Sequence, residues 1–134
     1  MGLKVPQKKP SHLTEAELRI MHIVWKKDKA TVADVAASLP DELNLAYNTV
    51  LTTMRILESK GFLKHAKAKD ARAFVYRPVV GRTEATRSAV HHLLRRFFGD
   101  SAEALVLNLL EDEVLDDTEL KNVRKLLQEK GARK

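Results

Sequence analysis

Residues 47–77 read YNTVLTTMRILESKGFLKHAKAKDARAFVYR, and the fold can be worked out from this segment. In its first half, Val50, Met54 and Leu57 recur at the spacing that places side chains on one face of a helix. Gly61 follows them, and glycine readily ends a helix because it adopts backbone conformations that other residues avoid. The first half therefore predicts a helix that begins where the segment begins and ends just before the glycine.

The second half changes to two short strand-like runs, Phe62–His65 and Phe74–Arg77, on either side of the polar segment 66–73. This pattern predicts a β-hairpin. The hairpin and the lysine before it are strongly basic, and Asp70 alone opposes the cations Lys60, Lys64, Lys67, Lys69, Arg72 and Arg77. Such a concentration of positive charge favours a polyanionic partner.

Two further helices are expected before this segment. Thr14 and Glu17 have the spacing of a capping box, in which each side chain accepts a hydrogen bond from the other residue's backbone amide. Thr31 and Asp34 repeat that spacing, and Pro40 ends the second helix in a turn. Three short helices followed by a basic hairpin form a winged helix, whose third helix enters the DNA major groove while the hairpin, or wing, contacts the backbone.

The third predicted helix has a polar face opposite its apolar face. Asparagine can bond adenine, arginine can bond guanine, and a threonine methyl can pack on thymine, so this face suits base edges. Exposed helix faces are commonly polar, and the adjoining basic wing is what favours DNA over an ordinary solvated surface. The predicted DNA-binding residues are Tyr47, Asn48, Thr49, Thr52, Arg55, Lys67, Lys69 and Arg72.

Pro78 and Gly81 separate this head from three amphipathic helices, expected over 83–98, from Asp100 to about Glu111, and from residue 116 to about 130. These helices are too apolar for their size to stand alone in water, so we expect them to pair with a second copy. The alternative is that they fold back on the chain's own head. The predicted dimerisation residues are Leu93, Leu94, Phe97, Leu105, Val106, Leu109, Val123, Leu126 and Leu127.

The predicted fold is thus mainly α with a small β-hairpin wing. We expect a flexible basic tail over 1–10, a winged helix-turn-helix DNA-binding domain over 11–80 and a helical dimerisation domain over 81–131. The charge agrees with this division, because residues 1–81 contain 14 Lys and Arg against 8 Asp and Glu, whereas residues 82–134 contain 10 of each kind.

Composition argues against several other classes of protein. The chain has no cysteine, which removes disulfides and thiolate metal sites and is compatible with the cytoplasm. The adjacent pair His91 and His92 lacks the partners of a metal site, and the acidic run 111–117 lacks the glycine and spacing of a calcium loop. With no phosphate loop, nucleophile elbow, secretory signal or membrane-length apolar run, we expect a cytoplasmic protein that is not an enzyme and uses no cofactor or metal.

The segments 45–61, 99–101 and 105–109, together with the opening LTEAEL of residues 13–18 and Trp25, resemble the penicillinase-repressor (BlaI/MecI/CopY) family. The resemblance covers roughly residues 11–128. It implies homodimers that bind palindromic operators and repress an antibiotic-resistance operon. The positions that correspond to the family's recognition helix are Tyr47, Asn48, Thr49 and Thr52.

The resemblance also implies a route to derepression. In relatives controlled by a membrane-bound β-lactam sensor, a sensor protease is associated with cleavage of an Asn-Phe bond in the C-terminal module. The corresponding bond here joins Asn108 and Leu109, with leucine in place of phenylalanine. The absence of cysteine removes the thiolate motif expected of copper-responsive relatives, so the inducing signal stays open.

Two rival functions are compatible with the same elements. In one, the protein is a winged-helix module whose third helix docks on protein, although the uneven distribution of charge disfavours this function. In the other, the protein is a DNA-binding regulator that senses a small molecule held between its helical modules.

Overall fold

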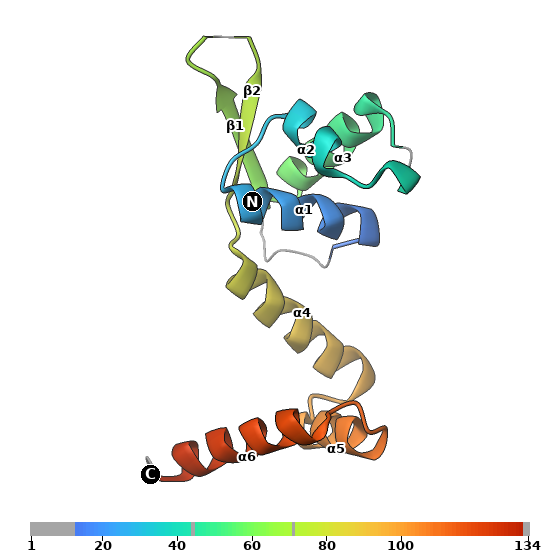
Figure 1. Cartoon of the computed structure of the whole chain (residues 1–134), viewed down its shortest axis with the longest axis vertical. Coiled ribbons are helices and arrows are strands. Elements are labelled where there is room, and N and C mark those ends of the chain that lie inside the picture. The colour runs from blue at the N-terminus through green and yellow to red at the C-terminus, as the bar shows by residue number, and fades with distance from the viewer. Residues whose placement is uncertain (1–12, 44, 71, 133–134) are drawn as a thin grey trace, which may run out of the picture. The chain divides into compact units, whose positions relative to one another are not determined.

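The computed structural model describes residues 13–43, 45–70 and 72–132 (Figure 1). The chain divides into two compact units, one that ends at Val90 and one that begins at His91. The elements are α1 (Glu15–Lys27), α2 (Val32–Ser38), the 3₁₀ turn η1 (Asp41–Leu43), α3 (Tyr47–Ser59), β1 (Leu63–Lys67), β2 (Phe74–Pro78), α4 (Arg82–Phe97), α5 (Ala102–Glu111) and α6 (Asp117–Ala132). This mostly helical fold with one antiparallel hairpin confirms the predicted class. The predicted domain ranges 11–80 and 81–131 stay predictions, and the predicted tail lies outside the described residues.

Both predicted capping boxes are present. The Glu17 amide donates to the Thr14 hydroxyl at 3.2 Å, and the Thr14 amide donates to the Glu17 carboxylate at 3.0 Å. The same reciprocal pair links Thr31 and Asp34, with both bonds at 3.0 Å. The backbone hydrogen bond from Thr31 holds the pKa of Asp34 below its ordinary value. These caps explain why α1 and α2 begin one residue after each threonine.

The end of α3 explains the glycine that follows it. Gly61 has a φ of +91°, a left-handed conformation that suits glycine. Its amide donates to the Glu58 carbonyl at 3.0 Å, and the Phe62 amide donates to the Leu57 carbonyl at 2.9 Å. This is a Schellman motif, which satisfies carbonyls that the helix leaves unpaired. The predicted helix is therefore confirmed, with its end one residue earlier than expected.

The hairpin differs in detail from the prediction. β1 begins at Leu63 and continues to Lys67, whereas the sequence predicted a strand over Phe62–His65. The strand begins later because the Phe62 amide closes the end of α3 and does not pair with β2. β2 extends one residue beyond the prediction, to Pro78, and the register pairs Leu63 with that proline and Lys67 with Phe74.

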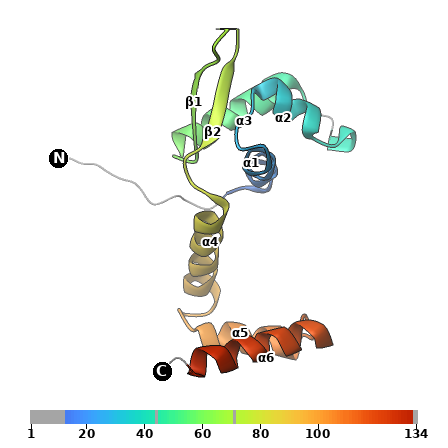
Figure 2. The same ribbon diagram turned by 60° about the vertical axis from the view of Figure 1, so that its left-hand side comes forward.

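A short bridge, which the sequence did not predict, attaches the hairpin to the helices. Ala30, between α1 and α2, donates its amide to the Tyr76 carbonyl at 3.0 Å and accepts from the Tyr76 amide at 2.8 Å. The tip of the hairpin projects beyond the helices of its unit (Figures 1 and 2). This bridge therefore anchors the wing to the helices through β2, while the tip extends beyond them.

The core of this unit lies among α1, α2, α3 and the base of the hairpin. Its buried apolar residues are Ile20, Met21, Val24, Ala30, Val32, Val35, Leu39, Val50, Met54, Leu57, Phe62, Leu63, Tyr76 and Val80. Glu17 is buried beside them, and its carboxylate accepts a hydrogen bond from the Lys60 ammonium at 2.7 Å. Burial raises the pKa of Glu17, but hydrogen bonds from Lys60 and Thr14 outweigh burial and hold the pKa below its ordinary value.

Replacing Lys60 by Met should lower the free energy of unfolding by about 1–3 kcal/mol at neutral pH, because the buried Glu17 carboxylate loses its charged partner. The lowered pKa of Glu17 means that the pair stabilises the fold fully above the ordinary carboxyl range, and that this contribution disappears as pH falls through the folded pKa. The free energies of unfolding of the native protein and of Lys60→Met, measured with urea, should therefore become equal as the pH is lowered through the acidic range. Lys26→Met, at an exposed position of α1, is the control, and an equal effect there would contradict the assignment.

The unit that begins at His91 contains the end of α4, α5 and α6. α5 is capped by Ser101, whose hydroxyl accepts from the Ala104 amide at 3.0 Å, so the predicted start at Asp100 was wrong. Asp100 has a φ of 66° and belongs to the turn before the helix. At α6, Asp116 and Glu119 exchange hydrogen bonds of 2.8 and 3.0 Å, as their spacing predicted, but the helix continues to Ala132, beyond the expected end near residue 130.

Candidate nucleic-acid interface

The outer face of α3 is open to solvent. Val50, Met54 and Leu57 are fully buried on the opposite side. The five α3 residues predicted to contact DNA are all exposed, and Tyr47 exposes 53% of its surface; the others are Asn48, Thr49, Thr52 and Arg55. The division of α3 into a buried and an exposed face is therefore as expected, while the contacts of the exposed face with DNA stay a prediction.

Arg55 also connects α3 to the hairpin. Burial raises the pKa of Tyr76 above its ordinary value, the charge of Glu58 raises it further, and the charge and hydrogen bond of Arg55 act in the opposite direction. The Arg55 guanidinium therefore lies close enough to the Tyr76 hydroxyl to lower its pKa, while the Arg55 side chain stays exposed.

A second connection joins α3 to β1. The His65 Nδ1 atom lies 2.8 Å from each carboxylate oxygen of Glu58. The same imidazole packs against the rings of Phe74 and Tyr76, with centroid distances of 4.7 and 5.4 Å. Together these contacts fix the base of the hairpin relative to α3. Sequence reasoning missed them because they join residues of two elements whose packing no periodicity reveals.

The predicted wing residues lie at the end of β1 and in the loop of the hairpin, and all three are exposed: Lys67, Lys69 and Arg72. The loop is closed by a hydrogen bond of 2.9 Å from the Ala68 amide to the Ala73 carbonyl. Asp70 accepts a hydrogen bond from the Arg72 amide at 3.2 Å.

Two further cations lie beside the predicted wing residues but were not among the predicted DNA-binding residues: Lys29, and Arg77 of β2. Lys29 and Arg77 line a cavity of about 390 Å³ together with Lys67 and Lys69. Within the described ranges, none of these four cations forms an ion pair with a carboxylate. Lys29 could not be placed there from sequence, because the Ala30 bridge is what brings it to the hairpin.

The pairing of the strands adds to this concentration of charge. Lys64 and Arg77 lie directly opposite each other in the hairpin register. Like charges at such positions destabilise a hairpin. An anion bound beside them would relieve that repulsion, so the register itself favours an anionic partner.

The predicted dimerisation residues lie on α4, α5 and α6, and most are exposed in the single chain. The exposed members are Leu93, Phe97, Val106, Val123, Leu126 and Leu127, and the half-buried members are Leu94, Leu105 and Leu109. Neither α4 nor α5 has a buried residue. Asn108 and Leu109, the candidate cleavage site, lie inside α5.

No helix among the described residues is long and apolar enough to cross a membrane. Residues 13–129 match the family described as Penicillinase repressor. The chain is 30% identical to the penicillinase repressor of Bacillus licheniformis over 98% of its own length and 97% of the relative. It is 25% identical to the methicillin resistance regulatory protein MecI of Staphylococcus aureus over 91% of this chain and 98% of that protein.

Among solved structures, the DNA-binding domain of the repressor BlaI is similar, with a TM-score of 0.50 and 29% identity. The similarity covers 58% of this chain and 93% of that domain. The family match extends over nearly the whole chain, and the structural match agrees with the helices and hairpin described above. The chain therefore belongs to the penicillinase repressor family.

Proposed function

We propose that this protein is a homodimeric, DNA-binding transcriptional repressor of the penicillinase-repressor type, which binds a palindromic operator through α3 and the wing. The observation that carries the proposal is the exposed polar face of α3 beside a hairpin whose cations have no carboxylate partners among the described residues. Family membership supports it, because relatives along nearly the whole chain are named as repressors.

The two elements have different tasks in this proposal. Asn48, Thr52 and Arg55 present a carboxamide, a methyl-bearing hydroxyl and a guanidinium, which together can distinguish base pairs in the major groove. Lys67, Lys69 and Arg72 supply positive charge to the phosphates, which gives affinity without sequence preference. The contact of Glu58 with His65 holds the hairpin, which binds the DNA backbone, against α3, which reads the bases.

The exposed apolar residues of the C-terminal helices support the proposed dimer. Phe97, Leu126 and Leu127 each expose more than half of their surface, at 68%, 61% and 66%. Large exposed apolar surfaces on a soluble chain mark a site of association. A second copy is the partner we propose, because a two-fold dimer presents two α3 helices to the two halves of a palindrome. Such a repressor acts in the cytoplasm and catalyses no reaction.

Derepression would follow from loss of the dimer. A cut between Asn108 and Leu109 by a sensor protease would separate α6, with its exposed leucines, from the DNA-binding unit along the chain. The bond lies in a continuous helix, and the Asp112 amide donates to the Asn108 carbonyl at 3.1 Å. Because proteases bind extended substrates, α5 would have to unwind locally before the cut.

Selection of tight-binding duplexes from a random DNA pool tests the function directly. We expect enrichment of an inverted repeat whose half-sites lie about one helical turn apart, with roughly 10–10.5 base pairs between their centres. Binding to the enriched sequence should weaken steeply as salt increases. Enrichment of no sequence, or no binding of duplex DNA at low ionic strength, would refute the proposal in favour of a protein-docking winged helix.

Replacing both Lys29 and Arg77 by Gln should weaken binding to operator and random DNA alike. These two residues line the cavity beside the wing, together with Lys67 and Lys69, where we expect the DNA phosphates to bind. The plot of log affinity against log salt should become shallower by about 0.9 for each phosphate that the variant no longer binds. Mobility shifts at several salt concentrations measure this slope. Lys125→Gln, an exposed cation of α6, is the matched control, and a slope that does not change in the double variant would remove these residues from the interface.

A further inference from the structure

We propose that a cavity between α1 and the beginning of α4 binds a small aromatic molecule that carries one anionic group. The cavity has a volume of about 300 Å³ and lies within the unit that ends at Val90. Its walls include Leu18, Trp25, Phe62, Thr86 and Ala89. This volume lies at the lower end of the range of small-molecule sites, roughly 300–1,000 Å³. About ten water molecules occupy this volume in liquid water, at about 30 Å³ each, so a ligand with one or two rings would fill the cavity.

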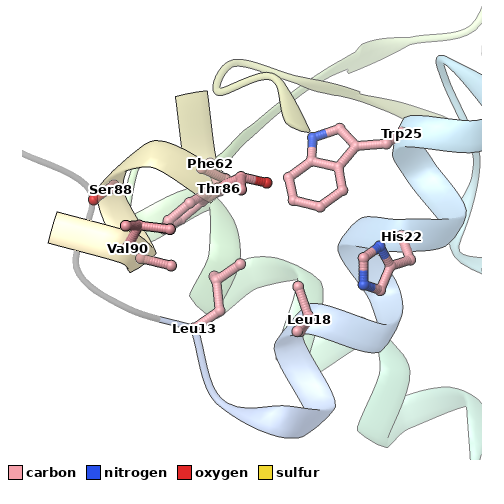
Figure 3. Close-up of a pocket in the computed structure, with 10 residues that line it drawn as sticks. Leu13, Leu18, His22, Trp25, Phe62, Thr86, Ser88 and Val90 are labelled. Carbon is pink, nitrogen blue, oxygen red and sulfur yellow. The ribbon is translucent and has the colours of Figure 1, made fainter. Parts of the chain in front are cut away.

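The aromatic preference comes from the walls. Figure 3 shows Trp25 and His22 projecting from α1, opposite Thr86 and Val90 of α4. The Trp25 indole N–H already donates to the Val80 carbonyl at 2.9 Å, so the ring is held in place and its polar atom is satisfied. Phe62 is almost fully buried behind the cavity. Fixed aromatic rings favour an aromatic ligand, and their rigidity lowers the entropy lost on binding.

The anionic preference comes from Arg82, which does not line the cavity itself but contacts two residues that do, Trp25 and His22. Its guanidinium carbon lies 5.7 Å from the centroid of the Trp25 ring, and its Nη2 atom lies 3.4 Å from the Nδ1 atom of His22. In the described part of the chain, Arg82 forms no ion pair with a carboxylate, and the residues that line the cavity include no acid. An arginine in this position can bind a carboxylate with two parallel hydrogen bonds.

The lining excludes other kinds of ligand. Among the described residues, the lining offers no carboxylate and no thiolate to a metal ion, and His22 is its only imidazole. The cavity is too small for a long acyl chain. A side chain of a second copy could fill an apolar cavity, but it would leave the guanidinium of Arg82 without an anion. A free aromatic acid could pack its ring against the walls of the cavity and pair its carboxylate with Arg82.

The chain offers a direct reporter for this site, because Trp25 is its only tryptophan. The full-length protein would be titrated with 3-phenylpropanoate and, separately, with the uncharged 3-phenylpropanamide, neither of which absorbs where tryptophan is excited. We expect a saturable change in Trp25 fluorescence with the acid, one site per chain by calorimetry, and binding of the amide at least about tenfold weaker. No saturable change, or equal affinity for the two compounds, would overturn the proposal.

Variants identify the groups responsible. Arg82→Gln should weaken binding of the acid about tenfold and leave binding of the amide unchanged. Arg87→Gln, at an exposed arginine of α4 for which the described residues show no hydrogen bond or ring contact with Trp25 or His22, should change neither. Ala89→Leu should fill the cavity and abolish binding of both compounds while circular dichroism stays that of the native protein. Retained binding in Ala89→Leu, or acid binding that Arg82→Gln does not weaken, would contradict the site. Affinity that falls as protein concentration increases would assign the cavity to a second copy instead.

Discussion

A variant in which Leu126 and Leu127 are both replaced by Glu should be a monomer that binds its operator about 100-fold more weakly, or worse. Both side chains are largely exposed in the single chain, so the substitutions leave its core intact. In the dimer they would place charges in an apolar contact, which is strongly unfavourable. Each DNA-binding unit would then bind a half-site alone and lose the gain from linked binding, roughly 10²–10⁴-fold.

Sedimentation and mobility shifts measure the two parts of this prediction. The matched control replaces Asn122 and Gln128, two exposed polar residues of α6, by Glu, and should retain both the dimer and operator affinity. A chain cut between Asn108 and Leu109 should behave as the leucine variant does. If the leucine variant stays dimeric, the interface lies elsewhere on the protein.

The second large effect concerns sequence discrimination. Replacing Asn48 and Thr52 by Ala should remove most of the preference for operator over random DNA, at about 1–3 kcal/mol for each base that the variant no longer reads. Both side chains lie on the exposed face of α3, away from Val50 and Met54, so folding should be preserved. Affinity for random DNA should change little, because the wing cations that bind phosphates are intact.

Competition experiments with operator and random duplexes measure that ratio. A useful contrast is the double variant Lys67→Gln and Lys69→Gln, which should weaken both kinds of binding and leave their ratio nearly unchanged. An unaltered ratio in the α3 variant would show that other residues read the bases. A changed ratio in the wing variant would show that the hairpin also reads sequence.

Local chemistry explains which parts of the fold could be predicted from the sequence. The capping pairs Thr14 with Glu17 and Thr31 with Asp34 act over three residues, so their spacing is enough to predict them. The exposed face of α3 follows from helical periodicity in the same way. Family resemblance added the link to operators, which periodicity alone could not supply.

The features that were missed depend on contacts between distant parts of the chain. Phenylalanine is common in strands, so the sequence predicted that Phe62 begins the first strand. Its amide instead donates to the Leu57 carbonyl and completes the hydrogen bonding at the end of α3. Lys29 joins the basic cavity only because Ala30 pairs with Tyr76. The start of α5 was misplaced for a local reason: both Asp100 and Ser101 are good caps, and the left-handed turn that follows Gly99 decides between them.

The link between Glu58 and His65 has a consequence for protein engineering. It attaches the hairpin near the last turn of α3, whereas Tyr47, Asn48 and Thr52 occupy the first two turns and are free of that attachment. The exposed positions of these two turns can therefore be randomised in a library, with the buried Val50 kept, without disturbing the contact that holds the wing. Repressors with reprogrammed target sites should be obtainable from this scaffold as long as the glutamate and the histidine are retained.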